Sequence, residues 1–220
     1  DALGMMKNIQ ERKFGEALKR IRETNCIPGS TASICPQLDT LCEANCVLTK
    51  RGEPVSIGML QRFVADWGRE HGEYGNLKVE EKTGRRVAII GGGPAGLAAA
   101  DLLARYGHSV TIFEANRKLG GTAMYGIPNF HLPKDVLEYE IERLKEVGVE
   151  TRSDVKIGEN ISLEEIFDEG FNAILIAVGA KNVTPFKAEG MNLKGIYDAY
   201  EFLIRLDHME VYKSPSKLIP

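Results

Sequence analysis

Apolar residues recur along this chain in two different patterns. In the first 80 residues they follow helical spacing, as at Phe14, Leu18 and Ile21, and again from Ile57 to Trp67. From Val87 onward, short unbroken apolar runs alternate with helical stretches. This change of pattern predicts a small all-α part, followed by an α/β part built on a parallel sheet.

The all-α part is predicted to contain three helices. Two short amphipathic helices, interrupted near Gly15, are expected within residues 1–25, and a third is expected from 57 to 67. From 25 to 53 the helical periodicity disappears, which favours loops. The charged and glycine-dotted stretch 68–84 is typical of a linker between two domains.

The α/β part is predicted from apolar runs that end on glycines or turn residues. The expected strands are 87–90, 110–113, 149–151, 154–157 and 172–179, and the expected helices are 97–106, 134–147, 163–167 and 197–206. Strands that alternate with helices pair in parallel through right-handed crossovers, and ligands then bind at the carboxyl ends of the strands. The predicted fold class is therefore α/β and Rossmann-like.

A glycine-rich loop joins the first predicted strand to its helix. Gly91, Gly93 and Gly96 match G-x-G-x-x-G, in which the glycines allow a tight turn, a close approach of backbone to a pyrophosphate, and helix–strand contact. The helix N-terminus offers N–H groups to phosphates. Glu114, 18 residues after the last glycine, can accept hydrogen bonds from ribose hydroxyls. The pattern predicts a dinucleotide site, the alternative being a turn that only lets a helix pack.

Two further stretches point to the same site. Gly120, Gly121 and Thr122 form a second glycine pair that can bring backbone N–H groups to the same pyrophosphate, or form an ordinary turn. The segment 177–179 ends a predicted strand at its carboxyl end, where ligands of parallel sheets bind.

All four cysteines fall within 21 positions, at Cys26, Cys35, Cys42 and Cys46. The spacings contain no pair of C-x2-C motifs and no nearby histidine, which argues against zinc and favours an iron–sulfur cluster. Zinc and inert buried thiols remain the alternatives. Gln61 interrupts the apolar stripe of the third helix, so its amide either bonds to loop backbone or faces the cysteine loop.

Composition narrows the classes of partner. A net charge of −3 over 220 residues, with both signs interspersed, gives no basic surface for nucleic acid. The apolar window 87–104 is broken by glycines, a proline and Asp101, so no membrane span is expected. No leader pattern of a basic start and a long apolar run is visible, so a cytoplasmic protein is expected. Because the chain begins with Asp1 and not methionine, we do not expect Asp1 to be its natural start.

Several of these motifs occur together in one order. In addition to the glycine loop, Glu114 and the second glycine pair, the chain contains Ile34-Cys-Pro-Gln37, Cys42-Glu-Ala-Asn-Cys46 and Ile57-Gly-Met-Leu-Gln61. In this combination, from about residue 14 to 206, the chain resembles the glutamate synthase small-subunit (beta chain) family. Similar proteins include the flavin subunits of ferredoxin–NAD(P) transhydrogenases and the FAD part of dihydropyrimidine dehydrogenase.

The resemblance implies FAD in the Rossmann-like part, [4Fe–4S] clusters in the all-α part, and electron transfer between them. It implies these FAD-binding residues: Gly91, Gly93, Pro94, Ala95, Gly96, Glu114, Ala115, Gly121, Thr122, Val155, Ala177, Val178 and Gly179. It implies these cluster ligands: Cys35, Cys42, Cys46 and Gln61, with Cys26 as an additional candidate. No general base or nucleophile is required, so Lys134 and Asp135 are interpreted as a solvated helix start.

The expected domains are a helical iron–sulfur-type domain at 1–80, without its N-terminal cysteine motif, and an incomplete FAD-binding domain at 81–220. The family's NAD(P)H domain has no counterpart in this sequence. The expected partners are therefore other subunits of an electron-transfer complex, or a missing C-terminal NAD(P)H domain, and neither nucleic acid nor membrane. Two alternatives stay open: a non-catalytic FAD-binding interaction module, and a fragment of an NAD-dependent dehydrogenase in which Glu114 selects NAD.

Overall fold

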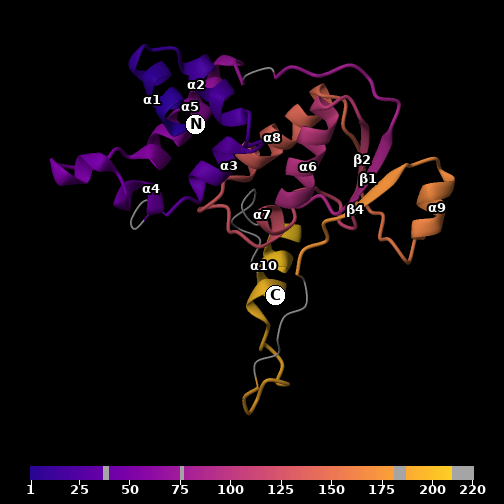
Figure 1. Cartoon of the computed structure of the whole chain (residues 1–220). Coiled ribbons are helices and arrows are strands. Elements are labelled where there is room, and N and C mark those ends of the chain that lie inside the picture. The colour runs from indigo at the N-terminus through magenta and orange to yellow at the C-terminus, as the bar shows by residue number, and fades with distance from the viewer. Residues whose placement is uncertain (37–39, 75–76, 181–186, 210–220) are drawn as a thin grey trace.

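The computed structural model describes residues 1–36, 40–74, 77–180 and 187–209. An all-α part and a sheet-containing part lie at opposite sides of the molecule, with α6 and α8 between them (Figure 1). The all-α part consists of α1 (Ala2–Gln10), α2 (Phe14–Arg22), α3 (Pro28–Ser33), α4 (Leu41–Ala44), the 3-10 helix η1 (Val47–Lys50) and α5 (Ile57–His71). The other part consists of β1 (Arg86–Ile90), α6 (Pro94–Arg105), β2 (Ser109–Phe113), α7 (Thr122–Tyr125), α8 (Lys134–Glu146), β3 (Glu150–Arg152), α9 (Leu163–Asp168), β4 (Ala173–Ile176) and α10 (Ala199–His208).

The sheet has four parallel strands in the order β3-β2-β1-β4. In this register Ile90 lies opposite both Phe113 and Ile176, so the carboxyl ends of β1, β2 and β4 align at one edge. The all-α segment followed by a Rossmann-like parallel sheet confirms the predicted fold class. The prediction of a strand at 154–157 is wrong, because only an isolated bridge between Ile157 and Ile161 forms there.

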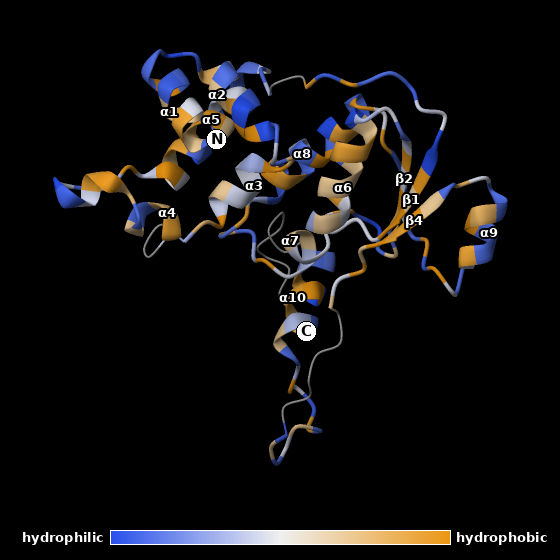
Figure 2. Ribbon diagram, in the orientation of Figure 1, coloured by the Kyte–Doolittle hydropathy of each residue, from blue (hydrophilic) through white to orange (hydrophobic). Residues whose placement is uncertain are grey.

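Apolar side chains cover both faces of the sheet. On one face Ile89 and Ile112 are fully buried against Leu97 of α6 and Leu137 of α8. On the other face a smaller cluster packs Phe113 and its neighbours under α9, which lies beyond the sheet in Figure 1. The strands accordingly appear as orange, apolar ribbons in Figure 2. Parallel strands buried on both faces explain why their sequences are unbroken apolar runs.

The all-α part differs from its prediction in two places. Helix α1 ends before Arg12, which takes a left-handed conformation with φ of 59°, and Gly15 lies inside the first turn of α2. The two helices expected within 1–25 are confirmed, and the break between them lies at 11–13, just before the position expected near Gly15. The stretch 25–53, expected as loop, contains the short helices α3, α4 and η1. Helices of four to six residues are too short to show the periodicity from which helices are predicted.

Polar groups buried between the two parts hold them together. Glu140 of α8 accepts hydrogen bonds from the backbone N–H groups of Gly29 (2.6 Å) and Ser30 (2.9 Å), and from the Tyr74 hydroxyl. The Arg22 guanidinium donates to the Tyr74 carbonyl oxygen at 2.7 Å. Tyr74 is 2% exposed, so the predicted linker 68–84 is wrong in its first part: α5 continues to residue 71 and Tyr74 belongs to an interface.

Strand β4 is an edge of the sheet and is poorly covered. Leu175, Ile176 and Val178 are all exposed, with Ile176 63% exposed. Native proteins usually cover, shorten or charge such edge strands. Within the described residues, no helix combines the length and the apolar character that crossing a membrane requires.

Candidate functional site

The glycine loop turns sharply between β1 and α6. Gly91 has φ of 107°, and a Cβ atom there would overlap the carbonyl oxygen of Ala177. A Cβ atom on Gly96 would overlap the carbonyl oxygen of Gly91, so α6 touches the loop at this point. Only glycine fits at these two positions, since one needs a positive φ and the other has no space for a side chain.

The second glycine pair docks on the first loop. The N–H group of Gly120 donates to the carbonyl oxygen of Gly92 at 2.7 Å. Gly121, with φ of 52°, faces Gly93, and a Cβ atom on Gly121 would lie 2.8 Å from the Cα atom of Gly93. Gly93 precedes α6 and Gly121 precedes α7. The pair therefore forms more than an ordinary turn, because it brings a second helix start beside the first.

Glu114 connects the end of β2 to the first glycine loop and to the turn that follows the strand. Its side chain is buried, and one carboxylate oxygen accepts a hydrogen bond from the Gly92 N–H group at 2.8 Å. The other oxygen accepts from the backbone N–H and the side-chain amide of Asn116, at 2.8 and 2.7 Å. A carboxylate offers about four acceptor positions, so Glu114 keeps capacity for a hydroxyl donor while it holds the loop in place.

A cavity of about 690 Å³ opens at this edge of the sheet. Twelve of the thirteen FAD-binding residues implied by the resemblance line it: Gly91, Gly93, Pro94, Ala95, Glu114, Ala115, Gly121, Thr122, Val155, Ala177, Val178 and Gly179. Gly96, the thirteenth, lies buried beneath the loop. The cavity has the size of a cofactor site, and five separate segments of the chain contribute these residues to it.

The space between the two glycine loops, beside Gly93, has room for the pyrophosphate of a dinucleotide. The Cα position of Gly93 faces open space, because the nearest atom to a Cβ placed there is 3.8 Å away. Backbone N–H groups at the starts of α6 and α7 lie around this space, and helix starts attract anions. The space that a side chain at Gly93 would fill is therefore available to a phosphate group.

Sequence reasoning missed six residues that line the cavity: Ile90, Phe113, Lys156, Ile157, Ala180 and Tyr200. Four of them directly adjoin predicted residues, namely Ile90, Phe113, Lys156 and Ala180, and Ile157 lies two residues from Val155. A wider window around each motif could have found these. Tyr200 lies on α10, 21 residues beyond Gly179, and no sequence signal links it to the glycine loops.

The four cysteines lie in different surroundings. Cys26 is buried in the core next to α8, and burial, with the charges of Asp101 and Glu140, raises the pKa of its thiol to about 12. Cys42 is exposed, whereas Cys35 and Cys46 are half-buried. The pKa of the Cys46 thiol is lowered, because backbone N–H groups of Val55 and Leu48 hydrogen-bond to its sulfur.

The structure does not bring the predicted cluster ligands together. Across the described part of the chain, no group of three His, Cys, Asp or Glu side chains is placed to hold a metal ion. Gln61 is half-buried on α5, and Gln37 of the cysteine motif lies outside the described residues. The cluster ligands therefore stay predictions.

Apolar side chains are exposed around the cysteines. Leu41 of α4 is 84% exposed and Val47 of η1 is 78% exposed, while Met59 and Phe63 of α5 are about half exposed. The arm between α4 and the start of α5, at the left of Figure 2, shows orange, apolar ribbon that stands away from the other elements. This segment is thus less covered than the core of either part.

The interpretation of Lys134 as part of a solvated helix start is wrong. It is 2% exposed, and its ammonium donates to the carbonyl oxygens of Ala123 (2.8 Å) and Ile127 (2.5 Å). Burial lowers the pKa of this lysine. It connects α8 to α7 and the loop after it, behind the second glycine pair. Asp135, by contrast, is exposed and pairs with Arg69 of α5 at 3.1 Å.

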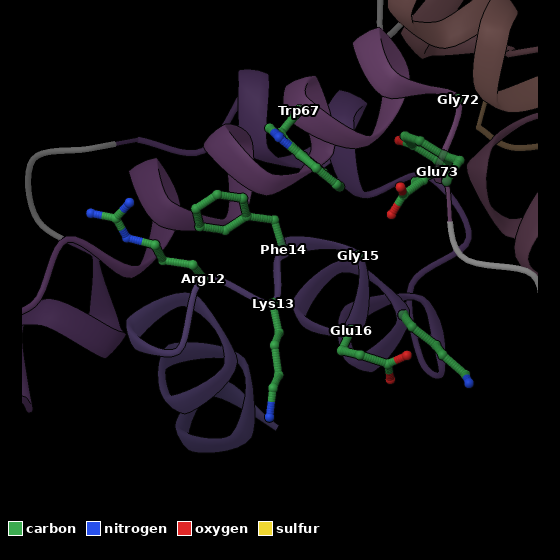
Figure 3. A pocket seen from close by; sticks show the side chains of 10 residues that line it. Arg12, Lys13, Phe14, Gly15, Glu16, Trp67, Gly72 and Glu73 are labelled. Carbon is green, nitrogen blue, oxygen red and sulfur yellow. The ribbon is translucent and has the colours of Figure 1, made fainter.

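A second hollow, of about 500 Å³, lies in the all-α part between the α1–α2 turn and the end of α5. Figure 3 shows Phe14 and Trp67 beside it, with Lys13, Glu16 and Glu73 around them. Its lining mixes both charge signs and contains neither a glycine loop nor a thiol. None of the predicted site residues lies there.

Two family models match the chain. The model described as dihydropyrimidine dehydrogenase domain II, 4Fe-4S cluster, matches residues 1–73, and the model of an NAD(P)-binding Rossmann-like domain matches residues 89–152. These matches agree with the predicted order of a cysteine-bearing helical part and a Rossmann-like part.

Relatives match over most of this chain but only part of their own length. The chain is 38% identical over 195 residues to the glutamate synthase [NADPH] small chain of Bacillus subtilis, which covers 89% of this chain and 39% of that protein. It is 39% identical over 197 residues to glutamate synthase [NADH] of Schizosaccharomyces pombe, covering 89% of this chain and 9% of that protein. Among solved structures, FprA of Mycobacterium tuberculosis in complex with NADPH matches with a TM-score of 0.49 and 24% identity, over 57% of this chain and 30% of that one.

Proposed function

We propose that this chain, a glutamate synthase small-chain-like protein, is the FAD-binding and cluster-bearing part of an electron-transfer oxidoreductase. In this proposal NAD(P)H reduces FAD bound in the glycine-lined cavity, and electrons pass between FAD and [4Fe–4S] clusters in the helical domain. We place the boundary between the two domains near residue 80. The whole activity requires more of the longer proteins than this chain, which spans 39% of the Bacillus relative.

One observation carries the proposal. Residues from the first glycine loop, from the second, and from the end of β4 are far apart in the sequence and line a single cavity at the carboxyl edge of the sheet. Ligands of open parallel sheets bind at this edge. A glycine-rich turn that served only to let α6 pack would need neither the second glycine pair nor the space beside Gly93.

Each part of the cavity has a chemical task in this proposal. The N–H groups at the start of α6 would donate to the pyrophosphate, and Gly121 and Thr122 would add donors from the start of α7. Glu114 would accept hydrogen bonds from ribose hydroxyls, and the segment 177–179 would lie along the flavin half. When bound, FAD supplies hydride acceptance and one-electron release. The protein binds, orients and shields it.

For the cluster we propose Cys35, Cys42, Cys46 and Gln61 as ligands. The lowered pKa of Cys46 supports this set, since a thiolate is the form that binds iron. Cys26 is left out, because its thiol is buried and its pKa is raised to about 12. Separated thiols are compatible with a cluster site, because metal binding itself can gather ligands and order the chain around them.

The exposed edge strand β4 supports the proposed partner. Leu175 and Ile176 would be covered by further parts of the longer proteins, or by another subunit of an electron-transfer complex. The NAD(P)H site lies outside this chain in the proposal. A non-catalytic FAD-binding module is the second candidate, and the separation of the three cysteines favours it.

Anaerobic reconstitution tests the proposed function. The chain is incubated with FAD, ferrous iron and sulfide, desalted, and assayed for flavin, iron and acid-labile sulfide. The expected result is one FAD per chain, with iron and sulfide retained together and a broad iron–sulfur absorption beside the flavin bands. Flavin without iron would leave the binding module as the function. A chain that binds NAD+ but no FAD would instead favour the dehydrogenase fragment.

A further inference from the structure

One wall of the cavity comes from neither glycine loop nor strand. Tyr200, in the first turn of α10, lines the cavity together with Thr122 and the end of β4. Its ring lies against the chain that follows α7, since a Cβ atom on Gly126 would lie 3.0 Å from the Cε2 atom of Tyr200. Among the described residues, α10 is the last helix of the chain, and it comes back to a site that the first strands build.

The far end of α10 is anchored away from the cavity. The His208 ring stacks on Tyr125 of α7, with ring centroids 5.2 Å apart and an angle of 28° between the planes. Asp207 is buried beside the charges of Lys134 and Lys118, and burial raises its pKa while these two cations oppose the rise. Ile204 packs against the main core. These contacts fix the helix on α7 and α8, the elements that also support the second glycine pair.

The near end of α10 is fixed by its own cap. The Asp198 carboxylate accepts a hydrogen bond from the N–H group of Tyr200 at 2.8 Å, which sets the backbone of Tyr200 at the start of the helix. The exposed side of α10 carries a separate group, in which Arg205 pairs with Glu201 at 2.6 Å and lies over the ring of Tyr197. Tyr200 belongs to the side that faces the cavity.

We propose that α10 is a clamp on the dinucleotide cavity, and that the Tyr200 ring packs against bound FAD. The inference rests on the proposed function, and it adds a cofactor contact from a part of the chain where no motif lies. An aromatic ring at a cavity wall gives a large contact area with few rotatable bonds, so it loses little entropy when a ligand covers it. Binding of FAD then stabilises α10, because the helix gains a contact in its first turn.

Titration of FAD into three variants of the full chain tests the ring contact. Tyr200→Ala should raise the Kd for FAD about tenfold, and Tyr200→Phe should stay near wild type, because the ring and not the hydroxyl makes the contact. Phe202→Ala, on the same helix but outside the cavity lining, is the matched control and should leave the Kd unchanged. An unchanged Kd for Tyr200→Ala, or an equal loss in the Phe variant, overturns the inference.

Amide hydrogen exchange tests the clamp, first in the wild-type chain and then in two of the variants. FAD should slow exchange across 199–208, and the slowing should be smaller in Tyr200→Ala than in Phe202→Ala. Bound FAD with no change of exchange in α10 contradicts the clamp while it leaves the proposed function intact. A wild-type chain that binds no FAD contradicts the proposed function, and the inference with it.

Discussion

The glycine-lined cavity and the cysteine segment are built in opposite ways. The glycine-lined part of the cavity is formed by backbone, and hydrogen bonds from Gly120 to Gly92 and from Gly92 to the Glu114 carboxylate hold it in shape. The cysteine segment relies on side chains, and Cys35, Cys42 and Cys46 are not gathered around a common point. The protein alone thus shapes the cavity, whereas it does not gather the cysteines.

The difference follows from the physics of each ligand. A pyrophosphate is bound by N–H groups whose directions are fixed once the turns and helix starts form. A cluster is bound by thiolates that repel one another until iron neutralises them, so the ligand completes the site. A dinucleotide site can therefore be preformed in a chain whose metal site is not.

The largest expected effect is the loss of FAD affinity when Gly93 is replaced, with iron binding unchanged. Gly93→Val should weaken FAD binding roughly a hundredfold, because the side chain fills the space proposed for the pyrophosphate. The fold should survive, since a Cβ atom there meets nothing closer than 3.8 Å. Calorimetric titration with FAD measures the loss. Ala98→Val, exposed on the same helix, is the control, and iron uptake on reconstitution should be unchanged in both variants.

The reciprocal effect, a loss of bound iron with FAD affinity kept, is expected when a ligand cysteine is replaced. Cys42→Ser should lose most of the iron bound on reconstitution and keep its affinity for FAD, because a serine hydroxyl is a poor ligand for iron. Cys26→Ser should keep its iron but unfold at a lower temperature, since it buries a hydroxyl in an apolar core. Iron analysis and thermal unfolding measure the pair. Equal iron in Cys42→Ser and wild type would remove Cys42 from the ligand set.

Glu140, in the interface between the two parts of the molecule, is expected to contribute to the free energy of unfolding. Glu140→Gln should lower the free energy of unfolding by about 2 kcal/mol, because an amide NH2 group cannot accept a hydrogen bond, whereas both carboxyl oxygens can accept one with or without the bound proton. Urea denaturation measures the change, with Glu142→Gln, exposed on the same helix, as the control.

The same residue predicts a dependence on pH. Burial raises the pKa of Glu140 above its usual 4.5, so the native state keeps a proton that the unfolded chain releases. Its contribution to stability is complete below pH 4.5 and is lost as the pH rises through the raised value. Unfolding measured from pH 4.5 upward should show this decline in wild type and a smaller one in Glu140→Gln. Identical slopes would contradict the assignment.

The smallest effect concerns thiol reactivity in the iron-free chain. The lowered pKa of Cys46 gives it more thiolate than an ordinary cysteine at neutral pH, whereas Cys26, with a pKa of about 12, remains a thiol. Iodoacetamide should therefore modify Cys46 several times faster than Cys26 at pH 7. Mass spectrometry of digested samples follows both. Faster modification of Cys26 would mean that the core around it opens.

The sequence predicts most of the fold because its strongest signals are local. The run from Val87 to Ile90, the glycines after it and the helix that follows form one unit, and the structure contains β1, the loop and α6 at these positions. The same holds for the helix from Ile57, whose apolar stripe is long enough to show its period.

Other features could not be predicted because they depend on contacts between distant segments. Tyr74 looks like a linker residue until Glu140 is placed beside it, and Lys134 looks solvated until α7 covers it. Tyr200 carries no motif, and only the position of α10 brings it to the cavity. Neither the periodicity of apolar residues nor the spacing of motifs carries information on such contacts.

The most direct test is a titration of FAD into the iron-free chain, repeated after anaerobic cluster reconstitution. One FAD should bind per chain in both samples, with Kd values within about threefold of each other, because the glycine loops that shape the cavity are preformed. FAD binding that appears only after iron and sulfide are incorporated would contradict this expectation, since the dinucleotide site would then depend on the cysteine segment for its shape.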